Sequence, residues 1–208
     1  MKRWMQALLF CAGVLFAGLL AFYRPGGEAK AQSPFDPSYN GNLLRLPVDF
    51  TSWIFVGSNL GLGYSWEVRA NTPAERARQE PAKYHNVYIS PPAYAAYKQT
   101  RQFPDKTVLV MDVYEAQSRE AQGVVNQGSF NGARLQVEVA VKNRNRPDGK
   151  ATDWAYYDFA DRSRPGQLLS QVGAFEDDAC YACHKAHAGD DNVWVQFYPT
   201  LRRIKQPD

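Results

Sequence analysis

The most constraining feature of this sequence is a regular alternation of apolar and polar residues between positions 134 and 142. Leu135, Val137, Val139 and Val141 are apolar, and the residues between them are polar, charged or small. A period of two places these four side chains on one face of a β-strand and their neighbours on the other face. The pattern therefore indicates a half-buried strand within a sheet.

Other segments predict a fold built around that sheet. Ser90 stands as an N-cap before a helix whose first turn contains Pro91 and Pro92, where the missing amide hydrogens do no harm. Tyr94 and Tyr97 would lie on the buried face of this helix. β-branched and aromatic residues predict four further strands, at 86–89, 107–114, 153–159 and 193–198. We therefore expect an α+β fold, mainly an antiparallel β-sheet with a few helices.

Near the C-terminus, Cys180, Cys183 and His184 have the spacing Cys-x-x-Cys-His, which is the attachment sequence for c-type haem. Residues i, i+3 and i+4 share one face of a helix, so two thiols can meet the vinyl groups of one haem while the imidazole lies under its iron. The acidic run 176–178 suits the positive end of such a helix. We therefore expect a C-terminal haem-attachment helix and one covalently attached haem c, with His184 as the iron ligand.

Three other interpretations of these residues stay open. A reversible Cys-x-x-Cys redox pair normally has a thioredoxin-like βαβ context, which is not visible here. A zinc site built from Cys180, Cys183, His184 and His187 would take all its ligands from one short segment, far closer together than structural zinc sites do. A disulfide across two residues would be strained. If haem is bound, we expect His187 at the surface or near a propionate.

The first 31 residues are typical of an export signal. Lys2 and Arg3 precede an uncharged, mostly apolar stretch, and Ala29-Lys30-Ala31 offers a small-x-small cleavage site. An uncleaved membrane anchor is the alternative, because about 20 uncharged residues can just span a bilayer. In both cases we expect a periplasmic domain. This segment also holds the entire net charge of +3, so we expect no nucleic-acid partner.

Seven short blocks, taken in order, resemble the cytochrome P460 family, which includes the cytochromes c′-beta. The resemblance covers about residues 45–203, and it identifies 48–208 as the haem domain after a connecting segment, 32–47, that is rich in Pro, Gly, Asn and Ser. The blocks are Trp53-x-Phe55-Val56-Gly57-Ser58, His85-Asn86-Val87-Tyr88-Ile89-x-Pro91, Phe103-Pro104-Asp105-x-Thr107-Val108, Glu138-x-x-Val141-Lys142, Trp154-Ala155-Tyr156-Tyr157, Cys180-x-x-Cys183-His184-Lys185 and Phe197-Tyr198-Pro199-x-Leu201.

The resemblance implies a periplasmic monohaem protein, commonly a homodimer, with His184 as proximal ligand and an open or weakly occupied distal side. Enzymatic members oxidise hydroxylamine with a haem that is cross-linked to a lysine side chain, and matching the strand places Met111 at that position. A thioether has no amine to form this bond. Lys106 is no obvious replacement, because its offset along the strand points to the opposite face. Whether the chain is an enzyme therefore stays open.

Three further positions match the distal side of the family. Glu138 falls where enzymatic members keep a carboxylate that accepts a proton from bound hydroxylamine, with a solvated strand residue as the alternative. Phe130 matches an aromatic residue near the distal face, although ordinary packing would also explain it. His85 occupies the position of an arginine in an enzymatic member, and a core or surface role is the alternative.

Three functions follow from these matches. The preferred one is an exported c-type monohaem cytochrome that binds or handles small nitrogen oxides, such as nitric oxide, at an open distal haem site. The alternative is an enzyme that oxidises hydroxylamine or nitric oxide, with Glu138 as proton acceptor and a partner cytochrome taking the electrons. The second alternative is an electron-transfer cytochrome in which Met111, the only methionine after the leader, is the sixth iron ligand.

Overall fold

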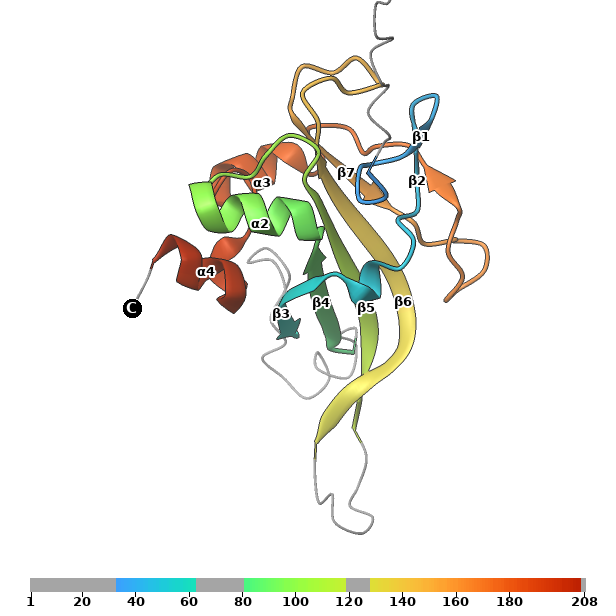
Figure 1. Cartoon of the computed structure of the whole chain (residues 1–208). Coiled ribbons are helices and arrows are strands. Elements are labelled where there is room, and N and C mark those ends of the chain that lie inside the picture. The colour runs from blue at the N-terminus through green and yellow to red at the C-terminus, as the bar shows by residue number, and fades with distance from the viewer. Residues whose placement is uncertain (1–32, 63–80, 119–127, 207–208) are drawn as a thin grey trace, which may run out of the picture. The chain divides into compact units, whose positions relative to one another are not determined.

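The structure, a computed structural model, describes residues 33–62, 81–118 and 128–206. The predicted leader lies outside these residues, and the elements below belong to one compact unit, residues 34–208. Its main sheet has the strand order β3-β4-β5-β6-β7, with every neighbouring pair antiparallel (Figure 1). The strands are β3 (Ile54–Leu60), β4 (Lys83–Ile89), β5 (Val108–Ser118), β6 (Ser129–Lys142) and β7 (Trp154–Asp158).

The α+β prediction is confirmed by two antiparallel sheets and three α-helices among the described residues. The helices are α2 (Pro91–Thr100), α3 (Tyr181–His187) and α4 (Pro199–Lys205). None of the helices in this part of the chain is long and apolar enough to cross a membrane. A second sheet joins β1 (Tyr39–Asn40), β2 (Leu43–Arg45) and β8 (Gln171–Val172). The segment expected only to connect, 32–47, therefore contributes two strands.

Both faces of the five-stranded sheet are covered. The face that carries Val110, Val137 and Val139 packs with Leu44 and other residues from the start of the described chain. The opposite face, here called the helical face, packs against residues of α2 and α4 (Figure 1). It carries Val87, Leu109, Met111, Glu138 and Tyr156, because paired residues in an antiparallel sheet share a face. Glu138 and Ala140 of the alternating strand thus lie on the helical face, whereas Arg134 contacts Asp112 and Phe50 of the opposite face.

Helix α2 forms as the sequence predicts. Ser90 is its N-cap and Pro91 and Pro92 open the first turn, although the Ser90 side chain makes no capping hydrogen bond. The helix ends at Arg101, whose left-handed backbone (φ 58°) closes the last turn. Tyr97 is fully buried against the helical face and stacks on the Phe103 ring at a centroid distance of 4.2 Å. This packing fixes α2 on the helical face of the sheet.

The prediction of a strand at 193–198 is wrong. Val193 forms only an isolated bridge with Asp190, and a 3-10 helix, η2 (Val195–Phe197), follows. Val193 and Val195, both buried, fit the period of a strand, whereas the buried pair Val195 and Tyr198 is separated by three residues and fits a 3-10 turn. Pro199 then begins α4, where its missing amide hydrogen is tolerated. The apolar residues were recognised correctly, but the period was misassigned.

Gly57 lets β3 approach the start of α4 directly. A Cβ atom at this position would lie 2.9 Å from Pro199 Cδ and 3.2 Å from Tyr198 Cα. Because backbone atoms cannot yield easily, we expect Gly57→Ala to lower the free energy of unfolding by about 1–3 kcal/mol in urea denaturation. Gly128→Ala is the matched control, since nothing lies within 4 Å of its Cβ position. Equal stability of the two variants would contradict this close packing.

Candidate haem site

The Cys-x-x-Cys-His residues lie at the start of α3. Cys180 is the N-cap, and Cys183 and His184 follow within the helix. All three side chains are partly buried, and both cysteines are free thiols. Burial, followed by repulsion from Glu138 and Cys183, raises the pKa of Cys180 to about 11. A protonated thiol fits a reversible redox pair poorly, because the attacking cysteine of such a pair has a lowered pKa.

Arg146 fixes the segment that leads into α3. Its side chain is only 1% exposed. Its guanidinium donates to the carboxylates of Asp148 (2.5 Å) and Asp177 (3.2 Å) and to the backbone carbonyl of Trp154 (2.9 Å). A planar guanidinium can serve several acceptors at once, which a lysine cannot do with the same geometry. The loop between β6 and β7 is thereby tied to the residues just before Cys180.

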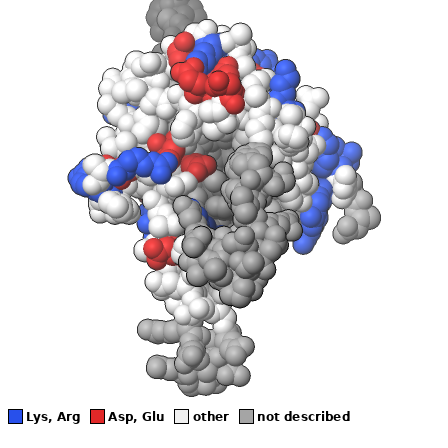
Figure 2. Space-filling model, turned by 180° about the vertical axis from the view of Figure 1, so that it is seen from behind, with Lys and Arg blue, Asp and Glu red and all other residues white. Residues whose placement is uncertain are grey.

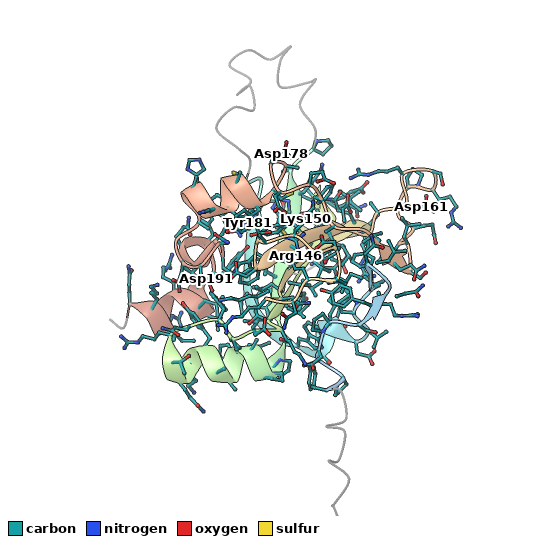
Figure 3. The ribbon with its side chains drawn as sticks, turned by 90° about the horizontal axis from the view of Figure 1, so that it is seen from above. Arg146, Lys150, Asp161, Asp178, Tyr181 and Asp191 are labelled. Atoms are coloured by element: carbon teal, nitrogen blue, oxygen red, sulfur yellow. The ribbon has the colours of Figure 1, made fainter. Side chains whose placement is uncertain are left out.

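A second cation near Arg146 also pairs with an acidic residue that precedes α3. Lys150 pairs with Glu176 at 2.7 Å, and Figure 3 shows Lys150 and Arg146 next to the chain that passes from Asp178 to Tyr181. The sequence suggested that the acidic run 176–178 serves the positive end of the helix. Two of its carboxylates, those of Glu176 and Asp177, pair with cations of the loop between β6 and β7 and tie the start of α3 to that loop.

A loop after α3, residues 190–194, supplies the groups around the His184 ring. Asp191 and Asn192 both have left-handed backbones, with φ of 43° and 61°, a conformation that Asp and Asn tolerate better than other non-glycine residues. Lys142 Nζ donates to Asp191 Oδ2 at 2.7 Å, and the Trp154 indole donates to Asp191 Oδ1 at 3.1 Å. Both oxygens of one carboxylate are therefore held, and the unusual turn is kept in place.

The same loop is also fixed to two helices. Asp190 accepts a hydrogen bond of 3.0 Å from the Tyr97 hydroxyl of α2, and it forms an ion pair with Lys205 of α4. Residues 190–192 are thus anchored by side chains from α2, β6, β7 and α4. This rigidity matters because the loop determines where the His184 ring points.

The His184 ring is held at both nitrogens. Nδ1 lies 2.8 Å from the backbone carbonyl of Asn192, so Nδ1 carries the proton and donates it to that oxygen. The indole N–H of Trp194 donates to Nε2 at 3.2 Å, and the Tyr156 ring lies 4.3 Å from the imidazole ring between centroids. Burial lowers the pKa of His184, against a smaller opposing effect of the Asn192 hydrogen bond. The ring is therefore neutral, with its lone pair on Nε2.

These donors fit a c-type haem. A haem-ligating histidine needs a neutral ring, a lone pair on one nitrogen and a carbonyl partner for the other nitrogen, and the contact between His184 and Asn192 provides all three. Two thiols, Cys180 and Cys183, start from the same helix. The Nε2 lone pair now accepts the Trp194 indole, so the indole and an iron ion would compete for it.

Met111 and Glu138 lie directly opposite each other on β5 and β6, on the helical face. Met111 is partly buried and packs against the same core cluster as Cys180. His85 is two residues from Val87 on β4 and shares that face, opposite Val113 on β5. The structure therefore brings three of the four predicted distal residues to one face of the sheet.

Glu138 has the most perturbed carboxyl group of this face. Its pKa is raised to about 6, mainly by burial and then by repulsion from Asp158, while a hydrogen bond from Gln136 and the charges of Arg162 and Lys83 oppose the rise. Its charge also contributes to the raised pKa of the Cys180 thiol, which links Glu138 to the attachment residues. A carboxyl group that titrates near pH 6 can both hold and release a proton under mild conditions.

Two other predicted positions lie elsewhere. Phe130 is paired with Gln117 at the start of β6 and is 45% exposed. Its eight-residue separation from Glu138 corresponds to about 26 Å of extended strand. His187 is exposed at the C-terminal end of α3, as expected. The structure does not bring Phe130 to the residues around Met111.

Several residues that shape the site were not expected from the sequence. Asn192 acts through its backbone carbonyl, and its only sequence signal is the Asp-Asn pair at 191–192, which favours a turn with a left-handed residue. Trp194 was assigned to a strand that does not exist. Lys142 stands at a polar strand position, yet it is buried. Arg146 lies in a loop where nothing in the sequence distinguishes it from a surface arginine.

The zinc interpretation finds no support in the geometry, since the described residues contain no group of three or more His, Cys, Asp or Glu side chains that could hold a metal ion. The sequence itself matches the family model described as Cytochrome P460 over residues 48–195. No curated protein matches the chain.

Proposed function

Because this chain belongs to the cytochrome P460 family, and therefore has a haem cofactor, we propose that it is a cytochrome that binds nitric oxide or a related small nitrogen oxide. In this proposal, one haem c is attached through Cys180 and Cys183, and His184 is the proximal iron ligand. The observation that carries the proposal is the single directed lone pair on His184 Nε2, set by the Asn192 carbonyl.

In this proposal, the residues on the helical face determine which ligands can approach the haem iron. When bound, the haem iron supplies a coordination position at which a diatomic ligand can bind. Met111, Val87 and Val113 present apolar surface on this face, which favours a small neutral ligand over a strongly hydrated anion. Glu138 is their polar neighbour, and its raised pKa reduces the negative charge there below about pH 6.

Absorption spectroscopy tests this proposal. The full-length protein, produced in a host that attaches haem c, should give a five-coordinate ferrous spectrum that changes on addition of nitric oxide. A low-spin six-coordinate spectrum that does not respond to nitric oxide would contradict the proposal.

Met111 separates ligand binding from electron transfer. We expect Met111→Ala to enlarge the distal side and to change nitric oxide affinity several-fold, with haem content and iron coordination unchanged. Met111→Leu is the matched control, because it keeps the volume and removes the sulfur. If both variants instead convert a six-coordinate spectrum to a five-coordinate one, the sulfur is an iron ligand, and the electron-transfer alternative is supported.

The raised pKa of Glu138 favours a second candidate function, the oxidation of hydroxylamine. A proton acceptor must be deprotonated to act, so kcat/KM should rise with pH through about 6 and level off above it. Glu138→Gln should lower turnover by about 100-fold or more and remove this pH dependence. Asp49→Asn, at an exposed residue before β3 and away from α3, should change neither. Unaltered turnover in Glu138→Gln would exclude Glu138 as the acceptor.

We further propose that the chain is exported and that it acts as a homodimer in the periplasm. Export is supported by residues 1–31 and by the attachment motif, because haem c is attached after translocation; the dimer is supported by family membership. Sequencing of the mature N-terminus should find Gln32 as the first residue. Sedimentation of the purified protein should show twice the monomer mass.

A further inference from the structure

A group of four exposed cations and one exposed aromatic ring lies on α3, η2 and α4. We call it the basic surface and define it by Lys185 of α3, Phe197 of η2, and Arg202, Arg203 and Lys205 of α4. All five residues are exposed. In Figure 2, Lys and Arg side chains gather along the right edge, where α4 lies in that view.

Hydrogen bonds join the segments of this surface. The Gln196 side chain accepts from the Gly189 backbone N–H at 2.8 Å and donates to the His187 carbonyl at 3.1 Å. The backbone carbonyl of Gln196 accepts from Arg202 Nη1 at 3.1 Å. The C-terminal end of α3, the 3-10 helix η2 and helix α4 therefore form one connected surface.

Aromatic rings connect this surface to the proposed iron ligand. Phe197 is 38% exposed and stacks on Trp194 with centroids 6.0 Å apart and an interplanar angle of 26°. Trp194 in turn meets the His184 ring edge-on at 5.2 Å. The exposed ring is thus two ring contacts away from the proximal histidine.

The charge of the surface is incompletely balanced by the described residues. Lys205 pairs with Asp190, and Arg202 bonds to a backbone carbonyl. Among the described ion pairs, none involves Arg203 or Lys185; the Lys185 ammonium lies 5.9 Å from the Tyr181 ring centroid. Cations in the last turns of α3 and α4 also interact favourably with the helix dipoles, but this does not explain the exposed Phe197 ring. An apolar centre with a charged rim is the usual composition of a protein interface.

We propose that the basic surface is the docking site for an acidic electron-transfer protein. This rests on the proposed function, since it assumes a haem on His184. Complementary charge would orient the partner and speed its approach, and the Phe197 ring would form the apolar centre of the contact. A partner bound at this surface would lie beside the aromatic rings that connect Phe197 to the proposed iron ligand.

Calorimetric titration with an acidic flavodoxin tests the proposal. The ferric full-length cytochrome should bind the oxidised flavodoxin at low salt and lose affinity as salt increases. Lys185→Glu combined with Arg203→Glu should weaken binding at least tenfold, and Phe197→Ser should weaken it without changing the salt dependence. Arg45→Glu is the control, since Arg45 is exposed on β2, in the other sheet, and it should bind like the wild type.

The absorption spectrum, recorded first, distinguishes a failure of the proposed function from a failure of the docking site. A protein without attached haem would overturn the proposed function. If the haem spectrum is intact, three results would contradict the docking site alone. These are no binding of the flavodoxin, binding by the double variant as tight as that by Arg45→Glu, and equally tight binding of a basic cytochrome c.

Discussion

Replacing His184 by alanine is expected to abolish the native proximal coordination of the iron while the haem stays attached to Cys180 and Cys183. The reason is that His184 Nε2 carries the lone pair that the Asn192 contact directs. Absorption spectra of the oxidised and reduced forms provide the measurement. Added imidazole should restore a spectrum close to that of the wild type, because it replaces the missing ring.

His187→Ala is the matched control for this variant. His187 lies one turn further along α3 and is exposed, so its removal should leave both spectra unchanged. If His184→Ala kept the native spectrum, or if His187→Ala lost it, the assignment of the proximal ligand would be wrong.

The second large effect is expected at Arg146. Arg146→Met should lower the free energy of unfolding by about 3–5 kcal/mol, because it breaks a buried ion pair and leaves the carboxylates of Asp148 and Asp177 without their partner. Arg146→Lys should recover only part of the loss, since an ammonium cannot reproduce the forked contacts. Urea denaturation monitored by circular dichroism provides the measurement.

Arg162→Met controls for the loss of an arginine as such. Arg162 also pairs with an aspartate, Asp158, but its side chain is 76% exposed, so the change should cost about 0–1 kcal/mol. A similar loss of stability in the two variants would contradict the view that Arg146 acts as a buried anchor.

Four of the five strands of the main sheet could be predicted from the sequence because they have strong local patterns, whereas β3 was not predicted. The alternation at 134–142 and the β-branched run at 107–114 correspond to β6 and β5, and Ser90 with its two prolines correctly marks the start of α2. β1, β2 and β8 were missed because each has only two or three residues, too few to show a period. Val193–Tyr198 was misassigned since its buried residues fit both periods.

The site was predictable only where residue identity specifies the chemistry. Cys180, Cys183 and His184 have a spacing with a known use, whereas Asn192 contributes a backbone atom that any residue has. Burial and the nearby charge of Asp158 on β7 perturb Glu138, and neither can be recognised in a local alternation, so the alternation alone suggested a polar, solvated face. Lys142 and Trp154 reach Asp191 for the same reason: their partner is close in space and far in sequence.

The proposed function depends above all on one haem that is covalently attached to Cys180 and Cys183. The most direct test is the alkaline pyridine haemochrome spectrum of the denatured protein, together with its intact mass. We expect a c-type spectrum with one haem per chain that survives denaturation, and loss of covalent haem in Cys180→Ala combined with Cys183→Ala. Haem that is released on denaturation, or a mass equal to that of the polypeptide alone, would show that no haem is covalently attached.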